Sequence, residues 1–389
     1  MAEKEILLWD ERGRGFPALV RYGPHLFLSG SDGYRDPATE ELDFSLIYKP
    51  IEQCHNAFSR IRRRLERAGM TGDCVMRVLH FTSGQEWSLK RMAVWPDYFG
   101  EVGHSEAVAW GAQAKMADFN AITAMAIGLT RGVPRHVVVP QPRRGQSARL
   151  VRAGDFLYAF GVGGYTNPFT GEEVPIDAPD AFRRQHFNNF ETLRSFMDEV
   201  PAPLSDFVRL DAGFRRNVED ARAFRACTKE LFGGRIPFAH FALPLGELAN
   251  RLIQLGGIAV APGVDKEVYW SPDDPDIAET VRAGELVFLS SLPGNRDPES
   301  GEVMRELCAD KRGQARQALR CLAAALTRAG TDMDRMLSLE VYLRDIYFED
   351  EFIEVAKDVF GSDCPAIGVA GAELEEGIEV QLVGVAGVS

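Results

Sequence analysis

Histidines that stand beside carboxylates or in apolar strands are the side chains of this sequence best suited to move protons. In the segment GHSEAVAW, the residues His104, Glu106 and Trp110 have even spacing, so a β-strand there would place them on one face. A carboxylate next to an imidazole can set its pKa and form an acid–base pair. The same pattern also fits a loop histidine beside a surface glutamate.

Two further histidines lie within apolar runs. His240 stands in IPFAHFALP, close to Phe238, and His80 stands in VLHFT. Each can act as a catalytic base in a cleft, or it can be a buried residue whose hydrogen bonds are satisfied within the core. The sequence leaves both interpretations open.

No pattern in the chain predicts a metal or a cofactor. The six cysteines form no CxxC pair, and they are Cys54, Cys74, Cys227, Cys308, Cys321 and Cys364. The glycines of FGVGGYTNPFTG lack P-loop spacing and are typical of a turn. We therefore expect no bound cofactor and no metal site.

Composition and charge exclude several classes of partner. The 389 residues carry a formal net charge of −13, which repels nucleic acid. The sequence has no run of 18 apolar residues, and we expect no signal peptide and no membrane partner. We predict a reduced, cytoplasmic protein that acts on a small molecule.

Three ordered sets of landmarks show that one unit occurs three times. Similar strands end at Gly30, Gly161 and Ser291, which are 131 and 130 residues apart. Glutamines at the start of a predicted helix follow at Gln53, Gln185 and Gln314, and FG pairs follow at Gly100, Gly233 and Gly361. We predict three domains, over residues 1–132, 133–262 and 263–389.

Each repeat predicts the element order ββαβαββ. In the third copy, apolar residues recur at helical spacing from Ala315 to Leu326, and Gly330 is placed to end that helix. A sheet covered by helices on one face must bury its other face. We therefore expect an α+β fold in which the three sheets cover one another about a pseudo-threefold axis, as in a trimer formed by one chain.

The repeats resemble the Rid family of reactive intermediate deaminases, also called YjgF-type proteins. The resemblance rests on the strand before Ser291, the turn RDPESGE, the glutamine-initiated helix that ends in AG, and the FG pair before the final strands. It implies a chorismate-mutase-like α+β fold, homotrimers with active sites between subunits, and hydrolysis of enamines or imines. It further implies an arginine after the PA of the fifth strand and a glutamate on the last strand.

The chain departs from that pattern at both positions. The arginine position falls at Ile367 in the third copy, Glu106 in the first and Ala239 in the second, with Arg235 as a possible substitute. The last-strand position falls at Gln381, near Thr123 and near Gly256. Isoleucine cannot hold a carboxylate as a guanidinium does, and glutamine cannot take a proton at neutral pH. These losses argue against a 2-aminoacrylate deaminase.

We therefore predict a rebuilt site. Catalytic roles are assigned to His104, Glu106, His240, His80 and Arg235. Backbone donors and apolar walls are expected to contact the substrate through Phe16, Ser29, Gly30, Trp110, Phe160, Gly161, Phe238 and Gln381.

The predicted function is acid–base-assisted cyclisation or condensation of an apolar or aromatic carbonyl- or enamine-type intermediate in biosynthesis. One alternative is an imine or enamine deaminase that uses Arg235. The other is a non-catalytic ligand-binding or scaffold protein.

A chain that contains its own trimer should not form a trimer of chains through the same interface. We expect light scattering to give the mass of one 43.1 kDa chain or of a dimer. A stable trimer of whole chains built through the interface between repeats would contradict the predicted organisation.

Overall fold

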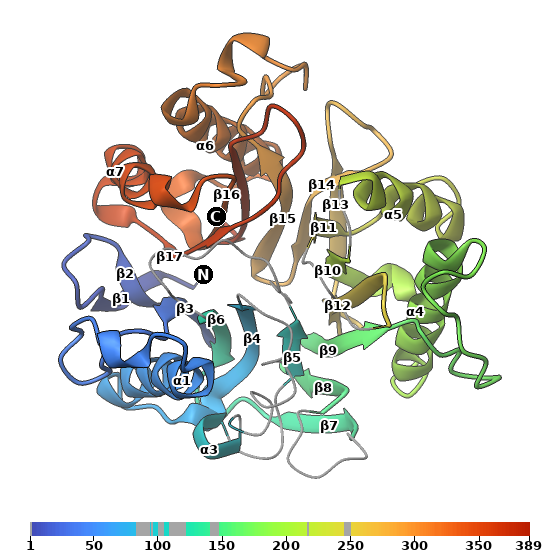
Figure 1. The fold of residues 1–389 in the computed structure, drawn as a ribbon, viewed down its shortest axis with the longest axis horizontal. Helices are drawn as coiled ribbons and strands as arrows, with labels where there is room; N and C mark the ends of the chain where they lie inside the picture. The colour runs from blue at the N-terminus through green and yellow to red at the C-terminus, as the bar shows by residue number, and fades with distance from the viewer. Residues whose placement is uncertain are drawn as a thin grey trace.

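The computed structural model describes residues 2–82, 94, 96–99, 105–108, 122–140, 148–215, 218–244 and 250–389. These residues form three six-stranded sheets that lie towards the middle of the molecule, with helices on the outside (Figure 1). The fold is therefore mixed α+β, as the sequence predicts.

Strands of each sheet are contiguous in sequence. The first sheet contains β1 Lys4–Trp9, β2 Pro17–Tyr22, β3 His25–Asp32, β4 Val75–Thr82, β5 Ser105–Val108 and β6 Ile122–Leu129. The second contains β7 Arg135–Val139, β8 Leu150–Ala153, β9 Phe156–Gly163, β10 Phe207–Phe214, β11 Ala239–Pro244 and β12 Ile253–Val260. The third contains β13 Lys266–Trp270, β14 Ala278–Ala283, β15 Leu286–Pro293, β16 Met336–Leu343, β17 Ala366–Gly371 and β18 Val380–Gly387.

The three sheets share one topology. Their orders are β1-β2-β3-β6-β4-β5, β7-β8-β9-β12-β10-β11 and β13-β14-β15-β18-β16-β17. In each sheet the last pair is parallel, and the other pairs are antiparallel. A parallel pair needs a crossover connection, which is why a helix precedes each edge strand β5, β11 and β17.

One strand of each repeat was missed from the sequence, because β2, β8 and β14 are each joined to the next strand by a tight hairpin. Gly23, Gly154 and Gly284 stand in these turns with φ of +54°, +57° and +56°. This left-handed backbone suits glycine and gives a two-residue turn whose twist matches the strands. The observed order is thus βββαβαββ rather than ββαβαββ.

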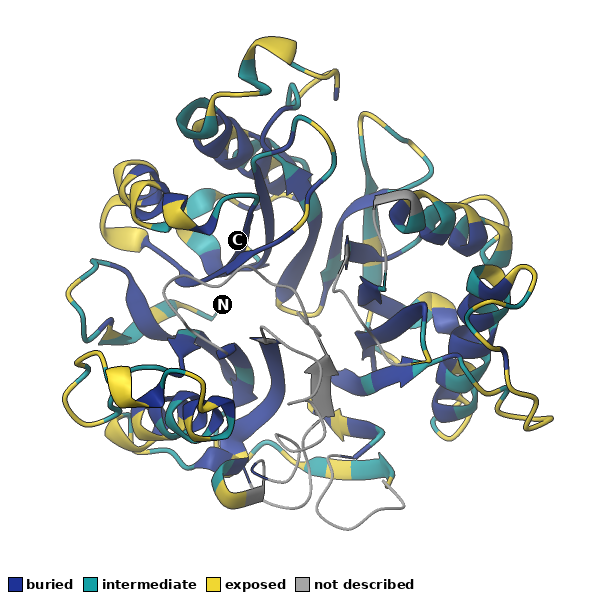
Figure 2. Ribbon diagram, in the orientation of Figure 1, coloured by how far each residue is buried: buried dark blue, intermediate teal, exposed yellow. Residues whose placement is uncertain are grey.

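Helices cover the outer face of each sheet and turn their polar side to solvent (Figure 2). They are α1 Pro50–Arg67, α3 Pro96–Phe99, α4 Ala181–Met197, α5 Val218–Leu231, α6 Lys311–Arg328 and α7 Glu349–Phe360. Asp310 caps α6 by accepting the N–H of Gly313 at 2.8 Å, and Gly330 follows its end with φ +73°. Within the described residues, no helix is long and apolar enough to cross a membrane.

Inner faces of the three sheets pack against one another. One buried cluster joins Phe27 of β3, Tyr158 of β9 and Phe288 of β15. A second joins Phe81 of β4, Phe241 of β11 and Tyr342 of β16. Each sheet therefore buries on its neighbours the apolar face that its own helices leave uncovered.

A chain of buried ion pairs crosses this centre and touches all three sheets. Arg77 of β4 pairs with Asp211 of β10, and the Nε of Arg209 lies 2.8 Å from the other oxygen of Asp211. Arg209 also binds both oxygens of Glu340 in β16, at 2.7 and 2.8 Å. Tyr342 donates its hydroxyl to Glu340 at 3.0 Å. Each charge is compensated, as buried charges must be.

Breaking one link of this network should destabilise the whole chain. We expect Glu340→Ala to lower the free energy of unfolding by roughly 3–5 kcal/mol, because Arg209 would stay buried without its bidentate partner. Urea denaturation measures this, and Glu66→Ala, which removes an exposed partner of Arg62, is the matched control. Equal losses in both variants would contradict the structural role of the central pair.

Candidate functional site

The sheets meet at three junctions, and each brings the short edge strand of one sheet beside the third strand of the next. These pairs are β5 with β9, β11 with β15, and β17 with β3. The three parallel pairs have the same register. Val78, Leu210 and Leu339 lie opposite Glu106, His240 and Ile367, respectively. Thus Glu106, His240 and Ile367 hold equivalent positions in their strands.

This register corrects two positions inferred from the sequence. His240, and not Ala239, is the counterpart of Ile367, and both donate a backbone N–H to a serine of the neighbouring sheet. On the last strand of the second repeat, the counterpart of Thr123 and Gln381 is Gln254 rather than Gly256. Thr123, Gln254 and Gln381 pair with Asp32, Gly163 and Pro293, respectively, which hold the same place in the third strand of each sheet. A fixed count from the FG pair gave the wrong residue, because the connection between that pair and the fifth strand differs in length among the repeats.

At the junction of the third and first sheets, charged side chains fill most of the space. Only about 40 Å³ remains open beside Gly30, Thr123 and Ile367. Arg14, from the β1–β2 connection, reaches Glu349 of α7 at 2.6 Å and lies over the ring of Phe16. The pKa of Glu349 is raised because the carboxyl is buried. This junction is too full to admit an organic ligand.

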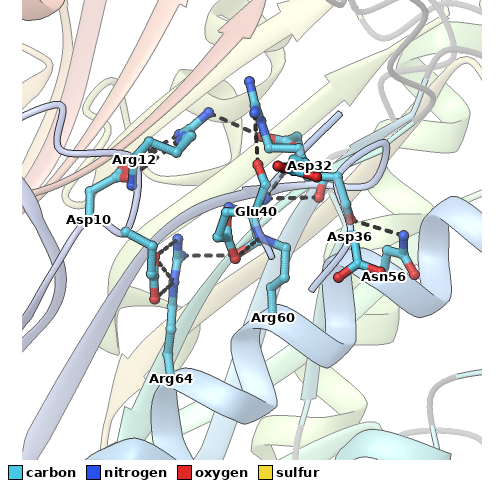
Figure 3. A network of polar contacts seen from close by, with 12 residues as sticks. Asp10, Arg12, Asp32, Asp36, Glu40, Asn56, Arg60 and Arg64 are labelled. Carbon is cyan, nitrogen blue, oxygen red and sulfur yellow. Dashed lines mark hydrogen bonds and ion pairs between the residues drawn. The ribbon is translucent and has the colours of Figure 1, made fainter. Parts of the chain in front are cut away.

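Arginines on α1 extend this packing inside the first repeat (Figure 3). The guanidinium of Arg60 binds Asp32 at 3.0 Å and also pairs with Glu40. That of Arg64 donates to the carbonyl of Ser29 at 3.1 Å and pairs with Glu11 at 3.0 Å. Both arginines are fully buried, and together they fill the space beneath β3.

Smaller residues occupy these helix positions in the third repeat. Gln53 and Gln314 hold equivalent places at the starts of α1 and α6, where each side chain donates to a carbonyl seven residues upstream. Counting from them, Cys321 matches Arg60 and Ala325 matches Arg64. The loss of two long side chains leaves room beside Cys321, which lines a cavity of about 350 Å³.

The junction of the first and second sheets is described in part. The backbone of β5, with Glu106, is placed, whereas His104 and Trp110 lie outside the described residues. On the β9 side, the half-buried Arg251 packs closely against Gly163, and desolvation lowers the pKa of Arg251. Gly161 lies close to Gly256 of β12, and Phe160 is half-buried beside it.

A cavity of about 350 Å³ opens at the junction of the second and third sheets. Its size falls within the range of small-molecule sites. The second repeat contributes α5 and β11, and the third contributes β14, β15, α6 and the segment that leads into β18. Histidine, serine, glutamine, arginine and acidic residues line the cavity beside leucine, isoleucine and proline.

His240 lines this cavity and is 7% exposed. Its Nδ1 is buried and makes no hydrogen bond, although the backbone N–H of the same residue donates to Ser290 Oγ at 3.0 Å. Its pKa is lowered to about 4, because burial disfavours the imidazolium and Arg225 on α5 repels it. The side chain is therefore a neutral imidazole at pH 7, with a ring nitrogen that no protein group uses.

Two serines on a bulge of β15 link the backbone of His240 to the side chain of Gln381. Ser290 accepts from His240 and donates to the carbonyl of Ala278 at 2.6 Å. Its neighbour Ser291 accepts from the amide of Gln381, so the Ser291 hydroxyl proton remains available to another oxygen. The bulge thus brings His240 and Gln381 to consecutive residues.

Every arginine that lines the cavity is paired with an acid. Arg328 holds the buried Glu279 at 2.6 Å, and Arg225 lies 3.2 Å from Glu375. Arg296 lies 3.7 Å from Asp273. The pKa of Glu279 is raised because burial outweighs the pull of Arg328. No guanidinium in the lining is left to clamp a carboxylate.

Most of the other residues predicted for a site lie away from the cavity. His80 is fully buried. Its counterparts in the other two repeats, Ala212 and Val341, pack in the cores between sheet and helices. Arg235 is exposed, where it stacks on Trp270 and lies 3.6 Å from Asp276. Phe238 packs in the core of the second repeat, and Phe16 and Ser29 pack at the junction of the third and first sheets.

The cavity-lining residues that sequence reasoning missed include Arg225, Glu279, Ser290 and Arg328. Ser290 had a visible signal, because LSS at 289–291 matches LSG at 28–30 and would have pointed to the bulge. The others lie on helix α5, strand β14 and helix α6, far apart in sequence, and only the contact between repeats brings them together. No three His, Cys, Asp or Glu side chains among the described residues are grouped to hold a metal ion.

The buried histidines should make stability depend on pH. Burial lowers the pKa of His25 and His240 to about 4 and that of His186 to about 3, whereas an unfolded histidine titrates near 6.5. The unfolded chain therefore binds more protons, so stability should fall as the pH drops from 6.5 towards 4. Urea denaturation at several pH values should show a shallower decline in His240→Asn. The exposed His136→Asn should decline like the parent, and an unchanged slope in His240→Asn would contradict the buried neutral state.

Comparison with known proteins gives matches to single repeats and to the chain as a whole. The model of the family Endoribonuclease L-PSP matches residues 277–387. A RutC family protein of Pyrococcus horikoshii is 27% identical over 127 residues, which are 31% of this chain and 97% of that protein. One of Pyrococcus abyssi is 24% identical over 127 residues, with 31% and 96% covered.

Among solved structures, a chorismatase is similar over most of the chain. It aligns with 81% of this chain and 93% of its own, at a TM-score of 0.52 and 15% identity. A structure titled as a member of the conserved Rid family from Yersinia pestis aligns with 32% of this chain and 100% of its own, at 22% identity and a TM-score of 0.29. The third repeat matches a family model and the three sheets share one topology, so the chain is built from Rid-like repeats.

Proposed function

We propose that this protein is an enzyme that moves a proton on a small carbonyl compound bound between the second and third sheets. The observation that carries the proposal is His240, a buried neutral imidazole that lines a cavity of ligand size and whose Nδ1 has no hydrogen-bond partner in the protein. Neutral imidazole is a general base, and a buried base that no protein group engages is suited to a substrate proton.

The proposed chemistry is enolisation as the first step of ring closure or condensation. His240 takes a proton from the carbon next to the carbonyl and becomes imidazolium. The electron pair of that C–H bond moves to the carbonyl oxygen, which the free hydroxyl proton of Ser291 stabilises. Ring closure or condensation then consumes the enolate, and the imidazolium returns its proton.

We also infer that the repeats, bounded at residues 132 and 262, take the places of three subunits in one chain. Their shared topology and the three similar junctions support this. In such an arrangement each cleft is free to diverge, and the cavity at β11 and β15 is the one with room for substrate. The net charge of −13 and the paired arginines argue against RNA in this cavity.

Exchange of carbon-bound protons in D₂O tests the proposal without knowledge of the natural substrate. We expect the parent enzyme to catalyse exchange next to the carbonyl of phenylacetone, followed by NMR. His240→Asn, similar in size but not basic, should reduce the rate about 10²–10⁴-fold, the usual contribution of a general base. The exposed His136→Asn is the control.

The alternative functions predict different results in activity assays of the parent protein and its variants. A deaminase would release ammonia from imines of amino acids and lose that activity in Arg235→Ala, and a scaffold protein would catalyse neither reaction. The fold of the chorismatase raises chorismate as a further substrate to include. Exchange that His240→Asn leaves unchanged would refute the proposed base.

A further inference from the structure

Arg251, in the segment that leads into β12, is a half-buried arginine without an acidic partner. No carboxylate among the described residues forms an ion pair with it, and burial alone lowers the pKa of its guanidinium. The buried arginines of the chain each pair with at least one carboxylate, and they are Arg60, Arg64, Arg77 and Arg209. A guanidinium that loses water without gaining an acid is destabilising, so Arg251 is suited to an anion from outside the chain.

Gln254, three residues further along the chain, is a second polar group without a partner. The residue is 2% exposed, and neither its amide oxygen nor its amide nitrogen forms a hydrogen bond within the part of the chain that the structure describes. Buried polar groups normally find a partner in the protein or in a bound molecule. The amide therefore offers one acceptor and a pair of N–H donors to a ligand.

The side chains of Arg251 and Gln254 lie on the same face of the second sheet. Gln254 pairs with Gly163 of β9, and residues directly opposite each other in antiparallel strands direct their side chains to one face. A Cβ on Gly163 would overlap Cδ and Nε of Arg251, so the arginine stem occupies that face beside Gln254. The glycine leaves the room that the stem needs.

The third repeat shows where this face points. Three of its residues hold the places of Gly163, Arg251 and Gln254, and they are Pro293, Ile378 and Gln381. In both repeats the helix-start glutamine accepts the backbone N–H of the residue after the second of these places, which confirms the alignment. All three counterparts line the cavity between the second and third sheets. Arg251 and Gln254 thus occupy the corresponding place between the first and second sheets, where β5 contacts β9 and β12.

We propose that the junction of the first and second sheets binds a small organic carboxylate through Arg251 and Gln254. A guanidinium holds a carboxylate by two parallel N–H bonds. The amide oxygen of Gln254 needs a donor, so the ligand also carries a hydroxyl or amino group near its carboxylate. The net charge of −13 disfavours a dianion and makes a carboxylate a better ligand than phosphate. This site is separate from the cavity at His240 and does not depend on the proposed function.

Four probes separate the parts of this site: lactate, its neutral amide lactamide, propionate, which lacks the hydroxyl group, and inorganic phosphate. Each is titrated into the full chain and followed by NMR. We expect lactate to bind at least about tenfold more tightly than lactamide, because only lactate gains a charged hydrogen bond. Lactate should also bind more tightly than propionate and phosphate.

Two variants assign these preferences to their residues. Arg251→Met keeps the length of the stem and removes the charge, so it should abolish the preference for lactate over lactamide. Gln254→Leu should keep that preference and lose the preference for lactate over propionate. Arg316→Met, which changes an exposed arginine on α6, is the matched control and should bind all probes like the parent.

Stability without ligand separates a binding site from a structural ion pair. Because Arg251 and Gln254 have no partners within the described residues, we expect neither Arg251→Met nor Gln254→Leu to lower the free energy of unfolding in urea. Lactate should raise the free energy of unfolding of the parent and leave that of Arg251→Met unchanged.

Several outcomes would overturn the carboxylate site. They are lactate that binds no better than lactamide, phosphate that binds more tightly than lactate, no binding of any probe, and a large loss of stability in Arg251→Met. His240→Asn should bind lactate like the parent, and Arg251→Met should keep the proton exchange of the parent. Failure of this site is therefore distinguishable from failure of the proposed function.

Discussion

Buried charge at the centre of the molecule determines how the three sheets can meet. Arg77, Arg209, Asp211 and Glu340 lie in one chain of ion pairs, and all four are buried. Equivalent positions carry different residues: Ser338 stands where the other repeats have Arg77 and Arg209, and Leu79 stands where they have Asp211 and Glu340. Each repeat therefore contributes a different part of the ion-pair chain, and the repeats are not interchangeable.

Unequal repeats explain why the junctions differ. A homotrimer must repeat the same cleft, whereas here one position holds Glu106, His240 or Ile367, depending on the repeat. Large residues decide which clefts stay open. Arg60 fills the space beneath β3 in the first repeat, and Cys321 leaves the corresponding space beneath β15 empty. This position holds histidine at the junction that has room for a ligand, and isoleucine at the junction that arginines fill.

Local sequence patterns predicted the fold better than the site. Repeated landmarks, helix-ending glycines and alternating strands depend on neighbouring residues, so the three units and their helices could be predicted. Strands β2, β8 and β14 were missed because each is separated from the next strand only by a two-residue hairpin turn that contains a glycine with positive φ, such as Gly23. His240 was recognised as a candidate, but its partners Ser290 and Arg225 come from other elements. Whether an apolar strand histidine faces a core, as His80 does, or a cavity, as His240 does, depends on the next repeat.

The central claim is that His240 is a neutral imidazole at an open cavity, and NMR of ¹⁵N-labelled histidine tests it most directly. The His240 signals, assigned by comparison with His240→Asn, should show a neutral ring at pH 7 and a titration near pH 4. Addition of phenylacetone should shift these signals and leave those of the surface residue His136 in place. A His240 ring that titrates near pH 6.5 and does not respond to phenylacetone would contradict the account.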